Sequence, residues 1–127
     1  MAATATVGYQ NTTDIVLDMT AVASGTPDVY NIVVTRAFQV IGVAVICTAT
    51  VVGGTVTVGK SASAITAALA CDTVNAVTNA ATLAIANTVF AVGDTLRITV
   101  TTDGAKATVI VRTAPLALGD AVTVVGT

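Results

Sequence analysis

The sequence predicts an all-β fold, an antiparallel β-sandwich or jelly roll of about eight short strands. Strand-like runs rich in Val, Ile and Thr recur along the whole chain, and clusters of Gly, Pro, Asp and Ser separate them. No segment keeps a helical period long enough for βαβ units. At 127 residues, 54% of them hydrophobic, the chain is expected to form one domain around one core.

The N-terminal part of the chain predicts an arm followed by two strands. Residues 1–13 have no strong core pattern and are interpreted as an arm, and residues 14–127 as the sandwich domain. Residues 14–19 and 29–35 are predicted strands, and the cluster of Ser, Gly, Thr and Pro at residues 24–27 separates them. The first ten residues contain no basic side chain and no apolar run, so no signal peptide is predicted.

Residues 38–52 (FQVIGVAVICTATVV) form a long uncharged apolar run. A membrane-spanning helix needs about 20 such residues, and extending this run adds only Gly, Thr and Val. Because β-branched side chains dominate, the run favours one or two buried strands over a membrane segment. The pair Gly53-Gly54 then predicts a hairpin between the strands on either side of it.

Residues 61–88 give the least regular pattern, because Ala, Thr and Asn dominate them. The many Thr and Asn residues argue against a long helix, so short strands and loops are expected. Ile65 and Leu69 lie four positions apart, as on one face of a helix, which predicts a single helical turn near residues 65–70.

The last third of the chain carries the clearest alternation of apolar and polar residues and predicts two half-buried strands. Asp103-Gly104 between them is a strong hairpin signal, and residues 91–94 turn the chain into the first of the pair. Pro115 ends the second strand, since it cannot donate to a ladder, and residues 122–125 predict a final short strand. The residues expected to face the core are Leu96, Ile98, Val100, Ala107, Val109 and Val111.

The charged residues exclude several function classes. The acidic side chains are seven Asp, and the chain contains no His, Glu or Trp. His and Glu do much of the general acid–base work of enzymes, so the composition argues against an enzyme, and it indicates no cofactor. Five basic side chains and a net charge of −2 give no electrostatic footprint for nucleic acid or for an anionic membrane surface.

Four Asp residues are candidate metal or catalytic groups. Asp14 and Asp18 lie four positions apart in a predicted strand and therefore share one face. They fit paired carboxylates or calcium ligands, but two solvated charges on an edge strand are the favoured interpretation. Asp94 and Asp103 lie in turns that contain Gly, where Asp is common because its side chain binds nearby backbone. No metal site is predicted.

Cys47 and Cys71 lie 24 positions apart with no His and no third thiol, so they cannot form a zinc site. Either a disulfide or two buried thiols fits this pair. Buried thiols are favoured because Cys47 lies inside an apolar run, where a free Cys behaves as a small hydrophobic residue.

Residues 54–61 read GTVTVGKS, a formal match to the phosphate-binding pattern GxxxxGKS. That loop follows a buried strand and opens a helix, whereas Val and Thr between these two glycines predict a strand. No nucleotide site is expected.

The four aromatic residues, Tyr9, Tyr30, Phe38 and Phe90, are scattered. Faces that bind sugars or single-stranded nucleic acids use aromatic side chains as stacking platforms, so a carbohydrate-binding module is a weak alternative. Two interpretations of Tyr9 are equally favoured: it anchors the arm on a partner, or its ring packs on the sandwich of its own chain.

Two stretches of the chain resemble small β-rich virion proteins of tailed bacteriophages. They are GGTVTV at residues 53–58 and ANTVFAVGDTLRITVTTDGAKATVIV at residues 86–111. In these virion proteins a GG hairpin precedes an element with AN, GD and alternating apolar residues, and a DG hairpin follows. The resemblance covers the C-terminal two thirds of the chain.

The resemblance implies a capsid decoration (cement) or head-fibre protein. It implies a homotrimer on the capsid surface, made in the host cytoplasm, with the major capsid protein as partner. The composition agrees, because a chain rich in Val, Thr and Ala with 9% charged residues exposes apolar strand surface, which marks protein interfaces. We expect the arm, with Val7, Tyr9 and Gln10, to dock on the capsid or on a neighbouring subunit. The alternative is a host-facing binding module, for a glycan or a receptor, on a head fibre or spike.

Overall fold

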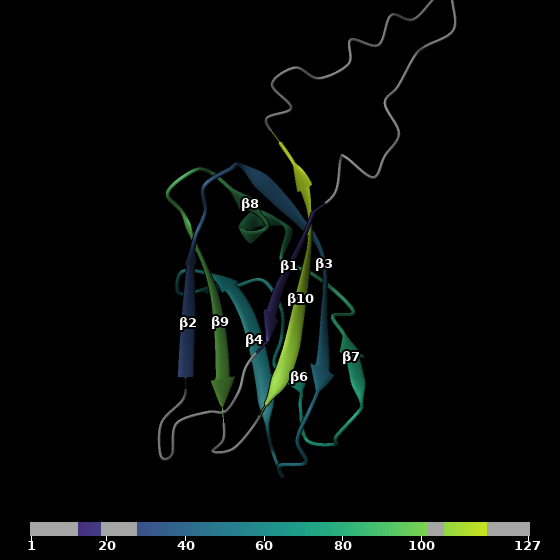
Figure 1. Ribbon diagram of the computed structural model, residues 1–127. Coiled ribbons are helices and arrows are strands. Elements are labelled where there is room, and N and C mark those ends of the chain that lie inside the picture. The colour runs from purple at the N-terminus through teal and green to yellow at the C-terminus, as the bar shows by residue number, and fades with distance from the viewer. Residues whose placement is uncertain (1–12, 19–27, 102–105, 117–127) are drawn as a thin grey trace, which may run out of the picture.

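The computed structural model describes residues 13–18, 28–101 and 106–116, which form two antiparallel sheets packed face to face (Figure 1). The first sheet has the order β1 (Thr13–Asp18), β10 (Ala107–Pro115), β3 (Phe38–Cys47) and β7 (Val77–Asn79), with β8 (Val89–Phe90) also paired to β3. The second has the order β2 (Asp28–Val33), β9 (Thr95–Thr101), β4 (Thr55–Lys60) and β5 (Ser63–Ala64), with β6 (Leu69–Ala70) also paired to β4. The all-β sandwich that the sequence predicts is confirmed.

The main strands alternate between the two sheets along the chain. β1 and β3 belong to the first sheet and β2 and β4 to the second, and β9 and β10 again lie in opposite sheets. The chain therefore crosses the core at almost every connection between long strands. β1 pairs with the last strand, β10, and β2 pairs with β9, so residues far apart in sequence become neighbours.

Both predicted hairpins are therefore wrong. The strands on either side of Gly53-Gly54 are β3 and β4, and those on either side of Asp103-Gly104 are β9 and β10; neither pair is hydrogen-bonded together. Gly53 does adopt the positive φ of 75° that such a turn needs, whereas residues 102–105 lie outside the described residues. Turn residues determine where a chain reverses. Two strands that each have one apolar face can bury those faces either by pairing in one sheet or by lying in opposite sheets across a core.

The core lies between the sheets and follows the predicted alternation. Along β9 and β10 the inward side chains are buried and the outward ones are half-buried or exposed. Near one end of the core, the rings of Phe38 on β3 and Phe90 on β8, which are paired across these two strands, stack with centroids 5.0 Å apart. The side chains with no exposed surface are Val45, Val56, Val58, Cys71, Phe90, Leu96, Ile98, Val100, Ala107, Val109 and Val111.

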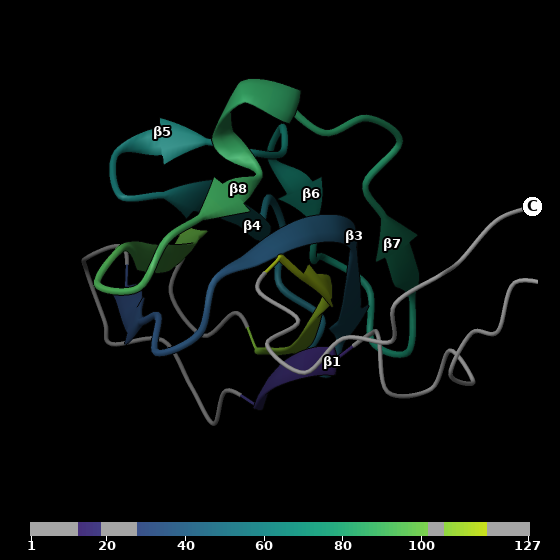
Figure 2. The same ribbon diagram turned by 90° about the horizontal axis from the view of Figure 1, so that it is seen from above.

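The middle segment contains short strands, as expected, but its helical turn lies elsewhere than predicted. Leu69–Ala70 forms β6, because these residues pair with Thr55 and Val56 of β4. The Thr66 hydroxyl accepts a hydrogen bond from the Val58 amide at 3.2 Å, which holds the preceding bend against β4. The helical turn is a 3₁₀ turn, η2 (Ile85–Asn87), and it projects on the side away from β1 when the sheets are viewed from above (Figure 2).

The ends of the described chain agree with the sequence where they can be compared. β10 ends at Pro115, as predicted. The arm residues Val7, Tyr9 and Gln10 and the predicted strand at residues 122–125 lie outside the described residues. Within residues 13–18, 28–101 and 106–116, no helix has the length and apolar character to cross a membrane.

Candidate functional site

The predicted carboxylate pair on β1 lies on the surface. Asp14 and Asp18 both point outward, and each is engaged by a neighbour on β10: Arg112 Nε lies 3.4 Å from Asp14, and the Thr108 hydroxyl donates to Asp18 at 3.3 Å. These contacts are cross-strand surface pairs, which matches the favoured interpretation of edge charges. No group of three or more metal-ligating side chains occurs among the described residues.

Asp94 acts as a turn residue, as the sequence predicts. Its carboxylate accepts a hydrogen bond from the Ala91 amide at 2.8 Å and lies 3.3 Å from the Lys60 ammonium. The hydrogen bond from Ala91, followed by the bond from Lys60, lowers the pKa of Asp94 from its ordinary value. The carboxylate therefore closes the turn that leads into β9. Asp103 lies outside the described residues.

The GxxxxGKS match is not a phosphate loop in the structure. Thr55–Lys60 runs as a regular strand, and Ser63–Ala64 pairs back onto it instead of opening a helix. Lys60 is also engaged, because its ammonium donates to the Val89 carbonyl at 3.0 Å and lies 5.7 Å from the centre of the Phe90 ring.

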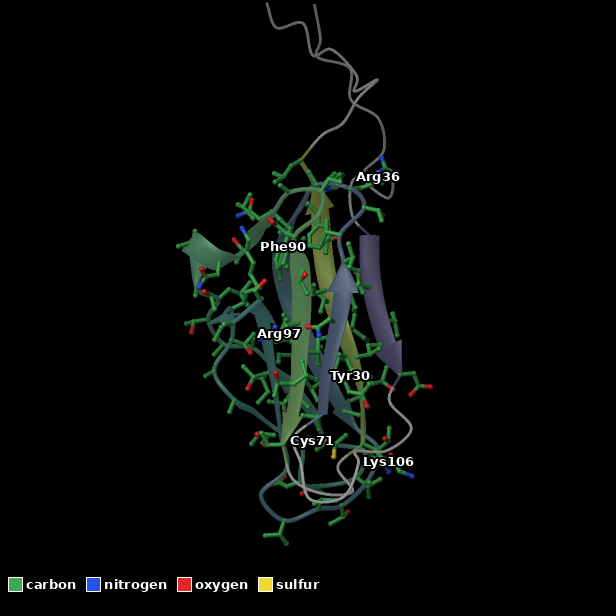
Figure 3. The ribbon with its side chains drawn as sticks, turned by 90° about the vertical axis from the view of Figure 1, so that its left-hand side faces the viewer. Tyr30, Arg36, Cys71, Phe90, Arg97 and Lys106 are labelled. Atoms are coloured by element: carbon green, nitrogen blue, oxygen red, sulfur yellow. The ribbon has the colours of Figure 1, made fainter. Side chains whose placement is uncertain are left out.

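Cys47 and Cys71 meet inside the protein as free thiols, with their sulfur atoms 3.0 Å apart. Cys47 ends β3 of the first sheet, and Cys71 directly follows β6 of the second, so the contact joins the two sheets. Burial, followed by the hydrogen bond to Cys47, raises the pKa of Cys71 to about 12. Figure 3 shows Cys71 near Lys106 at one end of the sandwich, opposite the end that carries Phe90 and Arg36.

The outer face of the first sheet carries a continuous apolar patch. Val16, Ile110 and Ala44 lie side by side in one row across β1, β10 and β3. Ile46 and Val77 lie side by side in the next row, across β3 and β7. Val16 is 60% exposed and Val77 is 58% exposed, so large aliphatic side chains face outward at both edges of this sheet. We call this surface the apolar face; its residues are Val16, Ile41, Ala44, Ile46, Val77 and Ile110.

The outer face of the second sheet is chemically different. Thr57 on β4 pairs with Thr99 on β9, and Thr55 pairs with Thr101, so their side chains form two rows of hydroxyls. The Thr55 and Thr101 hydroxyls are hydrogen-bonded to each other. In the next row, Arg97 occupies the outward position of β9, opposite Gly59 of β4. Arg97 lies midway along β9 and is labelled in Figure 3. We call this surface the hydroxyl face; its residues are Asn31, Thr55, Thr57, Arg97, Thr99 and Thr101.

The composition predicted exposed apolar strand surface, but the sequence analysis did not identify the residues of the apolar face, and it did not predict the hydroxyl face. The alternation pattern assigned only the inward side of each strand. Ile110 lies between Val109 and Val111, so an apolar residue occupies an outward position of the alternation. That departure from the pattern is the available sequence signal for the apolar face, and no corresponding signal marks Arg97.

Comparison of the chain with protein-family models, with curated proteins and with solved structures found no match.

Proposed function

We propose that this chain is a structural protein of a bacteriophage particle, which binds on the capsid surface and stabilises the shell through protein–protein contacts. The apolar face is the observation that carries this proposal. Large aliphatic side chains on three of its strands, Val16, Ile41 and Val77, lie exposed, and such a patch is typical of an interaction site. The resemblance of residues 53–58 and 86–111 to phage virion proteins supports the same assignment.

The strand order adds support. The two sheets have the orders β1-β10-β3-β7 and β2-β9-β4-β5, and successive main strands alternate between them. This arrangement supports a jelly-roll interpretation. In it, β5 and β6 together make up one interrupted strand, and β7 and β8 together make up another. Jelly rolls are common among viral capsid proteins and also among lectins, so this fold agrees with a virion protein without specifying its partner.

The occupant proposed for the apolar face is a second copy of the same chain in a homotrimer. The middle of the face consists of Ile110, Ala44 and Ile46, so covering it desolvates no charge there. Three charged groups lie beside the apolar rows: Asp14 and Arg112 pair with each other, and Asp18 accepts a hydrogen bond from the Thr108 hydroxyl. An uncharged centre with polar groups at the margin is the usual composition of a subunit interface.

The arm, with Val7, Tyr9 and Gln10, is then the segment proposed to contact the major capsid protein. A subunit that binds the assembled shell, and not its separate proteins, stabilises the assembly by mass action. This role needs no catalytic group and no cofactor.

Two matched substitutions test the apolar face as the subunit interface. Val16→Lys places a charge on the apolar face, and Val33→Lys places one at an equally exposed valine on the edge strand of the other sheet. We expect Val16→Lys to weaken self-association more than tenfold, because the contact would have to remove a strongly hydrated ammonium from water, and Val33→Lys to leave self-association unchanged. Light scattering over a range of concentrations measures the association. Equal association of the two variants would overturn the proposal.

A further inference from the structure

A shallow hollow lies on the hydroxyl face, on the opposite side of the sandwich from the apolar face. Its volume is about 210 Å³, and Thr57, Ser61, Arg97 and Thr99 supply its polar lining. Gly59, the residue paired with Arg97 across the sheet, also lines the hollow. A Cβ at Gly59 would lie 2.7 Å from the carbonyl oxygen of Ser63, so the tight turn from β4 to β5 requires glycine here.

Arg97 is held in place by a hydrogen bond and has no ion-pair partner among the described residues. Its Nε donates to the Asn31 side-chain oxygen at 3.1 Å, across the β2–β9 pair. The ion pairs among the described residues join Lys60 to Asp94 and Arg112 to Asp14, and neither includes Arg97. Because the bond to Asn31 uses Nε, the two terminal nitrogens of the guanidinium stay available for a bidentate partner.

The hydroxyls around Arg97 add hydrogen-bonding capacity. Thr55 and Thr101 bond to each other, whereas the hydroxyls of Thr57, Thr99 and Ser61 make no hydrogen bond to another described residue. Each of them can both donate and accept. The hollow therefore combines one fixed cation with three hydroxyls whose protons rotate freely.

We propose that this hollow binds the carboxylate-bearing sugar unit of an acidic glycan. The guanidinium of Arg97 pairs with the sugar carboxylate, and Thr57, Thr99 and Ser61 exchange hydrogen bonds with the ring hydroxyls. A neutral sugar fits less well, because neutral sugars are usually bound by stacking on aromatic rings. The described aromatic residues, Tyr30, Phe38 and Phe90, are packed on the core instead.

The site is distinct from the apolar face, because it lies on the second sheet and the apolar face lies on the first. A failure of this proposal would leave the interface proposal standing, because the binding test below does not depend on the oligomeric state.

Nuclear magnetic resonance titration of the ¹⁵N-labelled full chain tests the site with three small probes and with a glutamate-rich peptide. Glucuronate carries a carboxylate and ring hydroxyls, acetate carries only the carboxylate, and glucose carries only the hydroxyls. We expect glucuronate to shift the amide signals of Arg97, Thr99 and Gly59 with a Kd of about 1–10 mM. Acetate is expected to bind at least tenfold more weakly, and glucose to cause no shift.

Two variants and a matched control connect the binding to the guanidinium, and a further variant tests one hydroxyl. Arg97→Gln is expected to abolish glucuronate binding, and Arg97→Lys to weaken it at least tenfold, because an ammonium lacks the planar pair of donors. Arg112→Gln, on the other sheet, is the matched control and is expected to bind as the unsubstituted chain does. Thr99→Val removes one hydroxyl while keeping the side-chain shape. It is expected to weaken glucuronate binding and to leave acetate binding unchanged.

Four results would overturn the proposal. These are the absence of glucuronate shifts at the hollow, unchanged binding by Arg97→Gln with a native spectrum, equal affinity for acetate and glucuronate, and tighter binding of a glutamate-rich peptide than of glucuronate. The last result would assign the hollow to an acidic protein partner.

Discussion

Oxidation of the buried thiol pair is expected to link the two sheets covalently. Cys47 and Cys71 lie with their sulfur atoms 3.0 Å apart, so a disulfide needs only a small further approach. Oxidised glutathione supplies the oxidant: the two thiols lose their hydrogens, one disulfide forms, and two molecules of reduced glutathione are released. The cross-link would join the end of β3 to the segment after β6.

The expected stabilisation follows from the loop that the disulfide closes. For two cysteines 24 positions apart, the chain-entropy relation gives about 3.5 kcal/mol. With an unfolding entropy of about 2.1 cal/mol/K per residue over 127 residues, this raises Tm by roughly 13 °C. Oxidation is expected to be slow at neutral pH, because both thiols are buried and the raised pKa of Cys71 keeps its thiolate scarce.

Intact mass and calorimetry test this prediction together. We expect the oxidised chain to lose about 2 Da and to melt at higher temperature, and reductant to reverse both changes. The control is Cys71→Ala, which is expected to show neither change. Glutathione adducts in place of the 2 Da loss, or an oxidised chain with unchanged Tm, would refute the reasoning from the thiol contact.

Three further predictions concern the core and the turn next to the hollow. The Cys71 thiol, with its pKa raised to about 12 from an ordinary value near 9, keeps its proton in the folded state while the unfolded chain ionises. The free energy of unfolding is therefore expected to fall as pH rises from 9 to 12, by at most about 1.4 kcal/mol per pH unit. Urea unfolding at pH 8 and at pH 10.5 measures this loss, which should be smaller in Cys71→Ala than in the unsubstituted chain. Phe90→Ala removes a fully buried ring that stacks on Phe38, and it is expected to lower the free energy of unfolding by about 3–5 kcal/mol, measured with urea. A loss below about 1 kcal/mol would contradict this packing. Gly59→Ala is expected to lower the free energy of unfolding by about 1–3 kcal/mol, because its Cβ would meet the backbone of Ser63. The control is Gly53→Asn, at a positive φ with open space around it, which should change the free energy of unfolding by less than about 1 kcal/mol.

The local structure of the long strands could be predicted because burial has a period of two. Leu96, Ile98 and Val100 alternate with polar residues, and the structure buries all three. Pro115 ends β10 because proline has no amide proton for the ladder. The apolar run around Cys47 indicated a buried thiol, and the structure buries it. These features depend on residues close together in sequence.

The pairing of the strands could not be predicted in the same way. Gly53-Gly54 and Asp103-Gly104 mark reversals, but the choice between a hairpin and a crossing to the facing sheet depends on distant partners. β10 pairs with β1 and β3, and β9 pairs with β2 and β4, and none of these contacts leaves a local signal. The middle segment shows the same limit, since Leu69–Ala70 is a strand only because β4 provides its partner.

The two faces of the sandwich also depend on this pairing. Val16, Ile110 and Ala44 come from three distant segments, and they form one row only once β1, β10 and β3 are aligned. Arg97 and Gly59 are likewise brought together by the β4–β9 register. Such surfaces become visible only when the order of the strands is known.

The solution mass of the unsubstituted chain tests the central claim most directly, because the apolar face is proposed to bind a second copy. Sedimentation equilibrium is expected to give three times the chain mass of 12.5 kDa, with the trimer lost in Val16→Lys. A mass of 12.5 kDa at every concentration up to the solubility limit would contradict the proposal that this face is a subunit interface.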